Sequence, residues 1–246
     1  MDRKEFLQLS VLGGIGSSLL PSWMPLPMQG PSIAILTGMD EQNIVGSSYA
    51  SRMHKDVISP FLSMQQAAAA DGIAISPVSA FRSYQRQQEI FEGKYERFLA
   101  DGMTPEAAVA KIIEYSTIPG TSRHHWGTEL DLIDAAVDQP QSSLEAKNYH
   151  GNGPYCRLKE WMDAHAEDYG FYLVYTDNFH RKGFKYEPWH YSYAEVSIPL
   201  LKAYQELDLQ AFFENSQLLG KELLTPAFLD RYRSEHILDI NPALLP

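Results

Sequence analysis

Two short segments of the sequence bring together residue types that bind metals and move protons. The first occupies 120–131 and reads Gly-Thr-Ser-Arg-His-His-Trp-Gly-Thr-Glu-Leu-Asp, and the second occupies 187–190 and reads Glu-Pro-Trp-His. Imidazole and carboxylate groups are ligands that Zn²⁺ accepts, and a catalytic zinc site keeps three protein ligands and one position for water. The metal lowers the pKa of that water, and a nearby carboxylate can take its proton. Such a set could be supplied by His124, Asp131, His190 and Glu187.

Spacing alone leaves a structural interpretation of these residues open. His124 and His125 could cap a loop, and His190 could pack among the three aromatic residues that surround it in the sequence. Glu187 and His190 would face opposite sides of a regular strand, and Pro188 excludes an ordinary helix between them. Only an irregular turn would bring both side chains to one site.

Other common catalytic signatures are absent from the sequence. No serine is followed three residues later by lysine, which excludes the Ser-x-x-Lys class of acyl-enzymes. The sequence also lacks a Gly-x-Ser-x-Gly elbow, a Walker A loop, a His-Glu-x-x-His segment and a Gly-x-Gly-x-x-Gly segment.

The composition is that of a folded, acidic chain. Of the 246 residues, 44% are hydrophobic and 12% aromatic, which is enough for a sizeable core and excludes a disordered or low-complexity chain. Lys and Arg number 20 against 31 Asp and Glu, and the net charge of −11 predicts no general attraction to nucleic acid or anionic lipid. The single cysteine, Cys156, excludes an intramolecular disulfide and a Cys-rich metal site.

Hydrophobic periodicity predicts helices and short strands without a regular βαβ rhythm, which favours an α+β fold. Helical patterns cover 54–72, 83–99, 104–115 and 158–169, and Gly170 occupies the C-cap position of the last. Strand patterns cover 73–79, 130–133, 171–175 and 186–193. Pro77 places the first of these strands at a sheet edge or a bend.

The first thirty residues have the pattern of an export signal or an N-terminal anchor. The apolar stretch from Phe6 to Leu20 contains three glycines and is shorter than the roughly 20 residues that a membrane span needs. Residues 3–7, Arg-Lys-Glu-Phe-Leu, resemble a relaxed twin-arginine motif, and an ordinary N-terminal helix is the alternative. We therefore expect an exported protein of the periplasm or cell envelope, with no transmembrane domain beyond a possible anchor. The expected parts are an export segment at 1–30, a linker at 31–49, a catalytic domain at 50–196 and a C-terminal helical extension at 197–246.

Three ordered segments match a known pattern of motifs. The spacing Ser122-x-His124-x-x-Gly127-x-x-x-Asp131 fits the first signature of the LAS zinc peptidases, and Glu187-Pro-Trp-His-Tyr fits the second. Residues 79–87, Ser-Ala-Phe-Arg-Ser-Tyr-Gln-Arg-Gln, resemble the corresponding segment of the VanY-type D-alanyl-D-alanine carboxypeptidases in that group. The resemblance covers roughly residues 50–195. It implies one LAS-type domain, related also to the L,D-carboxypeptidases, with helices packed around a small antiparallel sheet.

The resemblance implies a role for each matching residue. Zn²⁺ would be bound by His124, Asp131 and His190. Glu187 would be the general base, and Arg82 would hold the scissile carbonyl and its developing negative charge. Ser122 and Gln87 would lie near the terminal carboxylate and the backbone of the substrate. For Arg82, Ser122 and Gln87, a purely structural role is the alternative.

Two places depart from the family pattern. The family usually has a small residue where this chain has Glu129, and on a regular strand Glu129 points the same way as Asp131. Glu129 would therefore either lie near the metal, as a ligand or as a carboxylate close to the metal or the substrate, or need another partner. His125 and Trp126 replace a more usual polar pair. We expect Trp126 to wall and narrow the substrate pocket, and His125 to form hydrogen bonds around the site without being a ligand.

The resemblance implies a zinc carboxypeptidase that removes a C-terminal D-alanine from peptidoglycan stem peptides, its expected partner. D,D- and L,D-cleavage are both open, because that choice depends on the shape of the pocket. One alternative is a cross-bridge endopeptidase of the same fold, which needs a cleft open at both ends. Another is a non-catalytic, zinc-containing cell-wall binding module, which could keep the ligands and lose Glu187. Nothing in the sequence indicates an oligomeric state.

Overall fold

A four-stranded antiparallel sheet positions the motifs in the structure, a computed structural model that describes residues 30–246. In spatial order its strands are β3 (Ile75–Ser79), β4 (Glu129–Asp134), β6 (His190–Tyr193) and β5 (Phe171–Leu173). A separate two-stranded sheet pairs β1 (Ile44–Val45) with β2 (Met53–His54). β3 is an edge strand, as Pro77 predicted, because proline has no N–H to donate to a second neighbour. The predicted α+β class with a small antiparallel sheet is confirmed.

Eight α-helices surround the sheets within the described residues. They are α1 (Ile33–Leu36), α2 (Ile58–Ala70), α3 (Tyr84–Ala100), α4 (Pro105–Ile112), α5 (Cys156–His165), α6 (Ala194–Gln205), α7 (Leu209–Glu214) and α8 (Pro226–Tyr232). Thr104 caps α4 by accepting a hydrogen bond from the N–H of Ala107 (3.3 Å), and Pro105 occupies the first turn. Gly170 ends the helical stretch before β5 with a φ of 78°, as its C-cap position predicted. None of the helices in residues 30–246 combines the length and apolar character needed to cross a bilayer.

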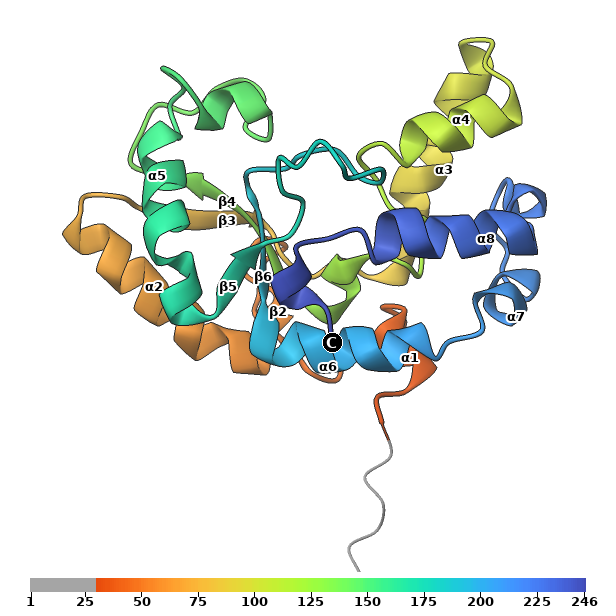
Figure 1. The fold of residues 1–246 in the computed structure, drawn as a ribbon, viewed down its shortest axis with the longest axis horizontal. Coiled ribbons are helices and arrows are strands. Elements are labelled where there is room, and N and C mark those ends of the chain that lie inside the picture. Colours follow the sequence, from red (N-terminus) through yellow and green to blue (C-terminus); the bar gives the residue numbers. More distant parts are fainter. Residues whose placement is uncertain (1–29) are drawn as a thin grey trace, which may run out of the picture. The chain divides into compact units, whose positions relative to one another are not determined.

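Two hydrophobic cores lie beside the sheet. In the first, apolar side chains of α2 and α5, such as Phe61 and Leu158, pack against those of β4, such as Leu132. In the second, α3 and α4 pack with the C-terminal helices. Figure 1 shows α2 and α5 to the left of the sheet and α3, α4, α7 and α8 to the right.

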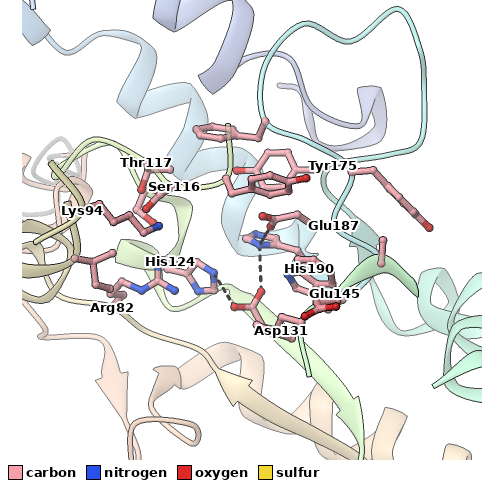
Figure 2. A pocket seen from close by; sticks show the side chains of 18 residues that line it. Arg82, Lys94, Ser116, Thr117, His124, Asp131, Glu145, Tyr175, Glu187 and His190 are labelled. Carbon is pink, nitrogen blue, oxygen red and sulfur yellow. Dashed lines mark ion pairs between the residues drawn. The ribbon is translucent and has the colours of Figure 1, made fainter. Parts of the chain in front are cut away.

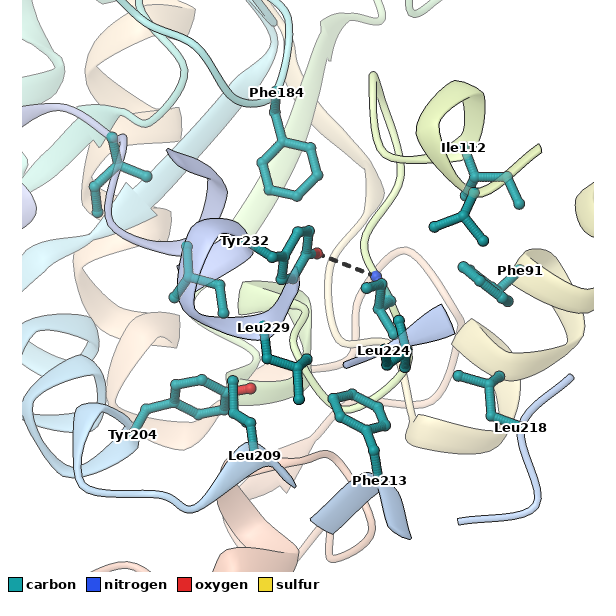
Figure 3. Packing of buried hydrophobic residues seen from close by; sticks show 14 of the residues in the cluster. Phe91, Ile112, Phe184, Tyr204, Leu209, Phe213, Leu218, Leu224, Leu229 and Tyr232 are labelled. Atoms are coloured by element: carbon teal, nitrogen blue, oxygen red, sulfur yellow. Dashed lines mark hydrogen bonds between the residues drawn. The ribbon is translucent and has the colours of Figure 1, made fainter. Parts of the chain in front are cut away.

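The C-terminal residues 197–246 are helical, as predicted, but they share the second core and are not an appendage. Leu209, Phe213 and Leu229 are buried together with side chains of α3 and α4 (Figure 3). The hydroxyl of Tyr232 accepts a hydrogen bond from the N–H of Ile118 (3.2 Å). In a second contact of this kind, the hydroxyl of Tyr204 donates to the carbonyl of Gly120 (2.8 Å). The C-terminal helices therefore hold the loop that leads into the first motif.

Residues 31–49 were expected to be a linker, and this expectation is corrected: the segment folds onto the rest of the chain. It contains α1 and β1, and the side chain of Leu36 is only 2% exposed. Residues 31–246 form one compact unit. Leu36 of this segment packs into the second core. Of the predicted export segment at 1–30, only Gly30 belongs to the described residues; residues 1–29 lie outside them.

Candidate metal centre

Adjacent strands bring the two histidines and the aspartate of the motifs together. In the β4–β6 pair, Asp131 lies directly opposite His190. His124 lies in a 3-10 turn, Arg123–Trp126, just before β4. One donor atom from each of the three residues lies within 4.8 Å of the others, and all three side chains are buried. The motifs therefore converge on one candidate metal centre (Figure 2).

The turn that carries His124 depends on Gly127. The φ of Gly127 is 67°, in the left-handed region that favours glycine. Its N–H donates to the carbonyl of His124 (3.2 Å) and closes the turn. A Cβ at this position would lie 2.7 Å from the backbone nitrogen of His54 in β2. The glycine of the motif is therefore a geometric requirement for placing His124.

His124 is oriented so that its Nε2 faces the centre. Its Nδ1 lies 2.6 Å from the carbonyl oxygen of Ala80, which can only accept, so Nδ1 carries the proton. Nε2 is then unprotonated and lies 3.4 Å from Oδ2 of Asp131. Burial lowers the pKa of His124, which keeps the imidazole neutral, as a metal ligand must be.

Glu187 reaches the centre through an irregular turn. Its N–H donates to the carbonyl of Tyr175 (3.2 Å), and its carbonyl accepts from the N–H of His190 (3.1 Å). The side chain therefore folds back, and Glu187 Oε2 lies 3.2 Å from Nδ1 of His190. Because Glu187 precedes β6 and His190 begins it, strand alternation does not separate the two side chains.

Glu129 contacts the other ring nitrogen of His190. Its Oε2 lies 3.1 Å from Nε2 of His190, while its Oε1 accepts hydrogen bonds from Arg123 Nε (3.2 Å) and Ser192 Oγ (2.7 Å). Burial would raise the pKa of Glu129, but Arg123 and His190 lower it to about 2, so the group is ionised. A carboxylate at Nε2 fixes the ring proton there and leaves Nδ1 free for a metal. Of the roles that the sequence left open, this geometry supports a carboxylate beside the metal that also has a partner of its own, Arg123, over a ligand.

The charges around His190 suit a divalent cation. Oδ1 of Asp131 lies 3.2 Å from Nδ1 of His190, is buried, and has no hydrogen-bond partner among residues 30–246. Burial would raise the pKa of Asp131, but His124 and His190 lower it, so Asp131 is a carboxylate. Burial would lower the pKa of His190, but contacts with Asp131, Glu129 and Glu187 raise it well above its usual value. The three carboxylates therefore favour a positive charge at this centre. Two imidazoles and a carboxylate at this spacing fit Zn²⁺.

A pocket of about 530 Å³ opens onto the metal centre. Six of the eight predicted site residues line it: Arg82, Ser122, His124, Asp131, Glu187 and His190. Other lining residues were not singled out from the sequence, among them Lys94, Ser116, Thr117, Glu145, Tyr175 and Tyr186 (Figure 2). The remaining two predicted residues, Gln87 and Trp126, do not line the pocket.

Comparisons with known proteins agree with this geometry. The model of the family described as "VanY: D-alanyl-D-alanine carboxypeptidase" matches residues 50–196. The chain belongs to the VanY family. A D-alanyl-D-alanine carboxypeptidase of Enterococcus faecalis is 29% identical over 162 residues, which is 65% of this chain and 55% of the relative. The chain thus spans little more than half the length of this VanY-family relative.

One solved structure reaches a TM-score that supports a shared fold. VanYB in complex with D-alanine-D-alanine has a TM-score of 0.50 and 23% identity, and the match covers 79% of this chain and 93% of VanYB. A variant of a vancomycin-resistance D,D-pentapeptidase VanY, in complex with Zn(II), has a TM-score of 0.49 and 25% identity, covering 76% of this chain and 93% of that one. The match of the family model to residues 50–196 confirms the predicted VanY-type family.

Gln87 is placed behind Arg82 and not in the pocket. Gln87 is fully buried, and its Oε1 accepts a hydrogen bond from Arg82 Nη1 (2.9 Å). Its Nε2 donates to the carbonyl of Thr117 (2.7 Å) and to Ser116 Oγ (3.3 Å). The expected contact with the substrate is therefore corrected: Gln87 anchors the guanidinium that lines the pocket.

Trp126 is a core residue and not the expected pocket wall. Its side chain is only 3% exposed, and its indole N–H donates to the carbonyl of Leu36 (3.0 Å). The guanidinium of Arg123 lies over its ring, 4.9 Å from the centroid. The 3-10 turn directs successive side chains to different sides, so Trp126 packs away from His124. Its ring instead contacts the guanidinium of Arg123.

His125 forms hydrogen bonds around the site, as expected. Its Nδ1 lies 2.6 Å from the carbonyl of Arg82, and its Nε2 accepts from the N–H of Gly120 (3.0 Å). Arg123, which sequence reasoning missed, is buried and forms an ion pair with Glu129. A signal was present, since a buried carboxylate at Glu129 needs a cation and Arg123 is the nearest basic residue in the motif.

Proposed function

We propose that this protein is a zinc-dependent carboxypeptidase that removes a C-terminal D-alanine from peptidoglycan stem peptides. The observation that carries the proposal is the convergence of three metal-binding side chains with the Glu187 carboxylate in one pocket. Zn²⁺ would be held by His124, Asp131 and His190. When bound, Zn²⁺ lowers the pKa of a water molecule and polarises the carbonyl of the scissile bond.

Glu187 is the residue that moves protons in this proposal. Its carboxylate lies at the metal centre beside His190, where it can accept a proton from the attacking water and pass it to the leaving amine. Transfer to the amine completes the cleavage of the peptide bond.

Arg82 is fixed before the substrate arrives. Its guanidinium donates to Gln87 Oε1 (2.9 Å) and to Ser79 Oγ (3.2 Å), and its side chain lines the pocket. A cation already held in place stabilises the negative charge that develops on the carbonyl oxygen without reorganising during the reaction. Ser122, also in the pocket wall, would contact the substrate.

The binding-module alternative is weaker on the same observations. A non-catalytic binding module would have no use for a fourth protonatable group beside the three ligands, yet the Glu187 carboxylate is there. A cross-bridge endopeptidase of the same fold would share the metal centre and differ in the ends of the cleft.

We further propose that the protein acts outside the cytoplasmic membrane, in the periplasm or cell envelope. The support for this is the export-like pattern of residues 1–30 and the location of peptidoglycan.

Digestion of purified muropeptides tests the proposal. The zinc-loaded protein is incubated with pentapeptide, tetrapeptide and cross-linked muropeptides, and the masses of the products are measured by mass spectrometry. We expect one stem to lose the mass of a single alanine, and the stem that shortens distinguishes D,D- from L,D-cleavage. Conversion of cross-linked dimers to monomers without loss of alanine would instead establish the endopeptidase. Unchanged masses in all three samples would contradict both enzymes.

A further inference from the structure

The walls of the pocket carry opposite charges. Figure 2 shows Arg82 and Lys94 on one side of the pocket, next to Ser116, and Glu187 and Glu145 on the other side. Any substrate that binds here meets cations at one end and carboxylates at the other. The arrangement therefore gives the bound peptide a direction.

Lys94 is a cation without a partner in this pocket. It lies on α3, seven residues after Gln87 and so on the same face of the helix. Among residues 30–246 it forms no ion pair and no side-chain hydrogen bond, although its side chain is half-buried at the pocket wall. Burial and the neighbouring charges of Arg82 and Arg97 lower its pKa, and the carboxylate of Glu187 offsets this only in part.

Two hydroxyl groups lie on the same wall as Lys94. Ser116 Oγ accepts a hydrogen bond from Gln87 Nε2 (3.3 Å), so its own O–H remains available to donate. The hydroxyl oxygen of the next residue, Thr117, is buried and has no hydrogen-bond partner in the described part of the chain. Cation and hydroxyl donors on one wall are the groups that bind a carboxylate.

We propose that Lys94, assisted by the hydroxyl of Ser116, binds the free C-terminal carboxylate of the substrate and so restricts the enzyme to exopeptidase cleavage. This inference rests on the proposed function. Arg82 is held by Gln87 and Ser79, and it is assigned to the scissile carbonyl, which leaves Lys94 as the cation for the terminal group.

The opposite wall supports the same orientation. A terminal carboxylate placed beside Glu187 would meet like charge, which disfavours the reversed orientation. A peptide whose residue beyond the scissile bond has no free carboxylate, such as a C-terminal amide, would leave Lys94 desolvated and unpaired when it binds. Lys94 therefore favours substrates with a free carboxylate beyond the scissile bond.

Two stem peptides that differ only in their last group test this assignment. One ends in D-alanine with a free carboxylate, and the other ends in D-alaninamide. We expect the wild-type protein to favour the acid in kcat/KM by about 10- to 100-fold, the usual range for a hydrogen bond to a charged group. Lys94→Met should remove this preference by raising KM for the acid, whereas kcat/KM for the amide should not fall, because the unpaired cation is removed as well. Lys94→Arg should restore part of it.

Arg86→Met is the matched control, because Arg86 is an exposed cation on α3 that pairs with Glu89 outside the pocket. It should keep the wild-type preference. Binding of both peptides to Glu187→Gln, measured by calorimetry, supplies a readout that needs no turnover: the acid should bind more tightly than the amide, and adding Lys94→Met should abolish the difference.

The outcomes separate the two claims. Equal losses for acid and amide in Lys94→Met, or equal binding of both to Glu187→Gln, would overturn the assignment of Lys94 and leave the carboxypeptidase standing. Failure of the wild-type protein to cleave either peptide would overturn the proposed function. In that case, tighter binding of the acid than of the amide that depends on Lys94 would still support the carboxylate site. Equal binding of the two peptides would overturn the carboxylate site as well.

Discussion

Glu187→Gln is expected to lower kcat/KM for release of D-alanine by about 10²- to 10⁴-fold, the range for loss of a positioned general base. The amide keeps the size of the side chain and the turn at 187–190, but it cannot accept a proton from water. Because Glu187 is not among the three clustered ligands, the variant should still bind one zinc ion. The measurements are initial rates with a D-alanine-terminated peptide and the zinc content by mass spectrometry.

Glu145→Gln is the control for this experiment. Glu145 is a second carboxylate in the lining of the same pocket, but it pairs with the exposed Lys147 and contacts neither histidine of the centre. We expect its kcat/KM to stay within a few-fold of wild type. Activity of Glu187→Gln near the wild-type level would remove Glu187 from the mechanism, and loss of zinc from the variant would make Glu187 a ligand.

Arg123→Met is expected to lower the free energy of unfolding by about 3–5 kcal/mol, the usual cost of removing one partner of a buried ion pair. Arg123 is 4% exposed and Glu129 is fully buried, so the substitution leaves the carboxylate in the interior without its main counter-charge. Urea denaturation of the metal-free protein measures the effect. The double variant Arg123→Met/Glu129→Ala should recover part of the loss, because it removes the stranded charge as well.

Arg86→Met again provides a matched comparison, since the exposed pair Arg86–Glu89 should contribute at most about 1 kcal/mol. If Arg123→Met cost no more than Arg86→Met, the buried pair would not stabilise the fold as the geometry indicates. A double variant less stable than Arg123→Met alone would show that Glu129 does not need Arg123.

The sequence was sufficient to predict most of the elements, because they depend on short-range patterns, whereas the metal-binding set was implied by the family resemblance. The strand over 130–133 and the strand ending near Tyr193 could each be read from local residues. Their register, which sets Asp131 opposite His190, could not, since it depends on pairing between segments about 60 residues apart. The family resemblance supplied that pairing, together with the turn at Glu187.

Sequence reasoning failed where a side chain's direction depends on packing. Trp126 was expected in the pocket, but the 3-10 turn directs it into the core below Arg123. Gln87 was expected to touch the substrate, but the face of α3 that carries it is buried, and the amide reaches only Arg82 and the wall behind it. Lys94 could have been found, since it lies seven residues further along that same helical face.

The C-terminal helices illustrate a different limit. Their amphipathic pattern predicted helices, but it did not indicate which surface they cover. The apolar faces of α3 and α4 are that surface, and the contacts of Tyr232 and Tyr204 tie it to the loop before the first motif. Residues 197–246 are therefore part of the scaffold that positions His124.

The measurement that tests the central claim most directly is the rate of D-alanine release from a stem peptide before chelation, after chelation and after return of zinc. Wild type and Asp131→Ala are compared, because Asp131 is the carboxylate among the three clustered ligands. We predict that chelation abolishes the rate for wild type, that one equivalent of zinc restores it, and that Asp131→Ala is inactive throughout. A wild-type rate unaffected by chelation would contradict the metal centre built here from His124, Asp131 and His190.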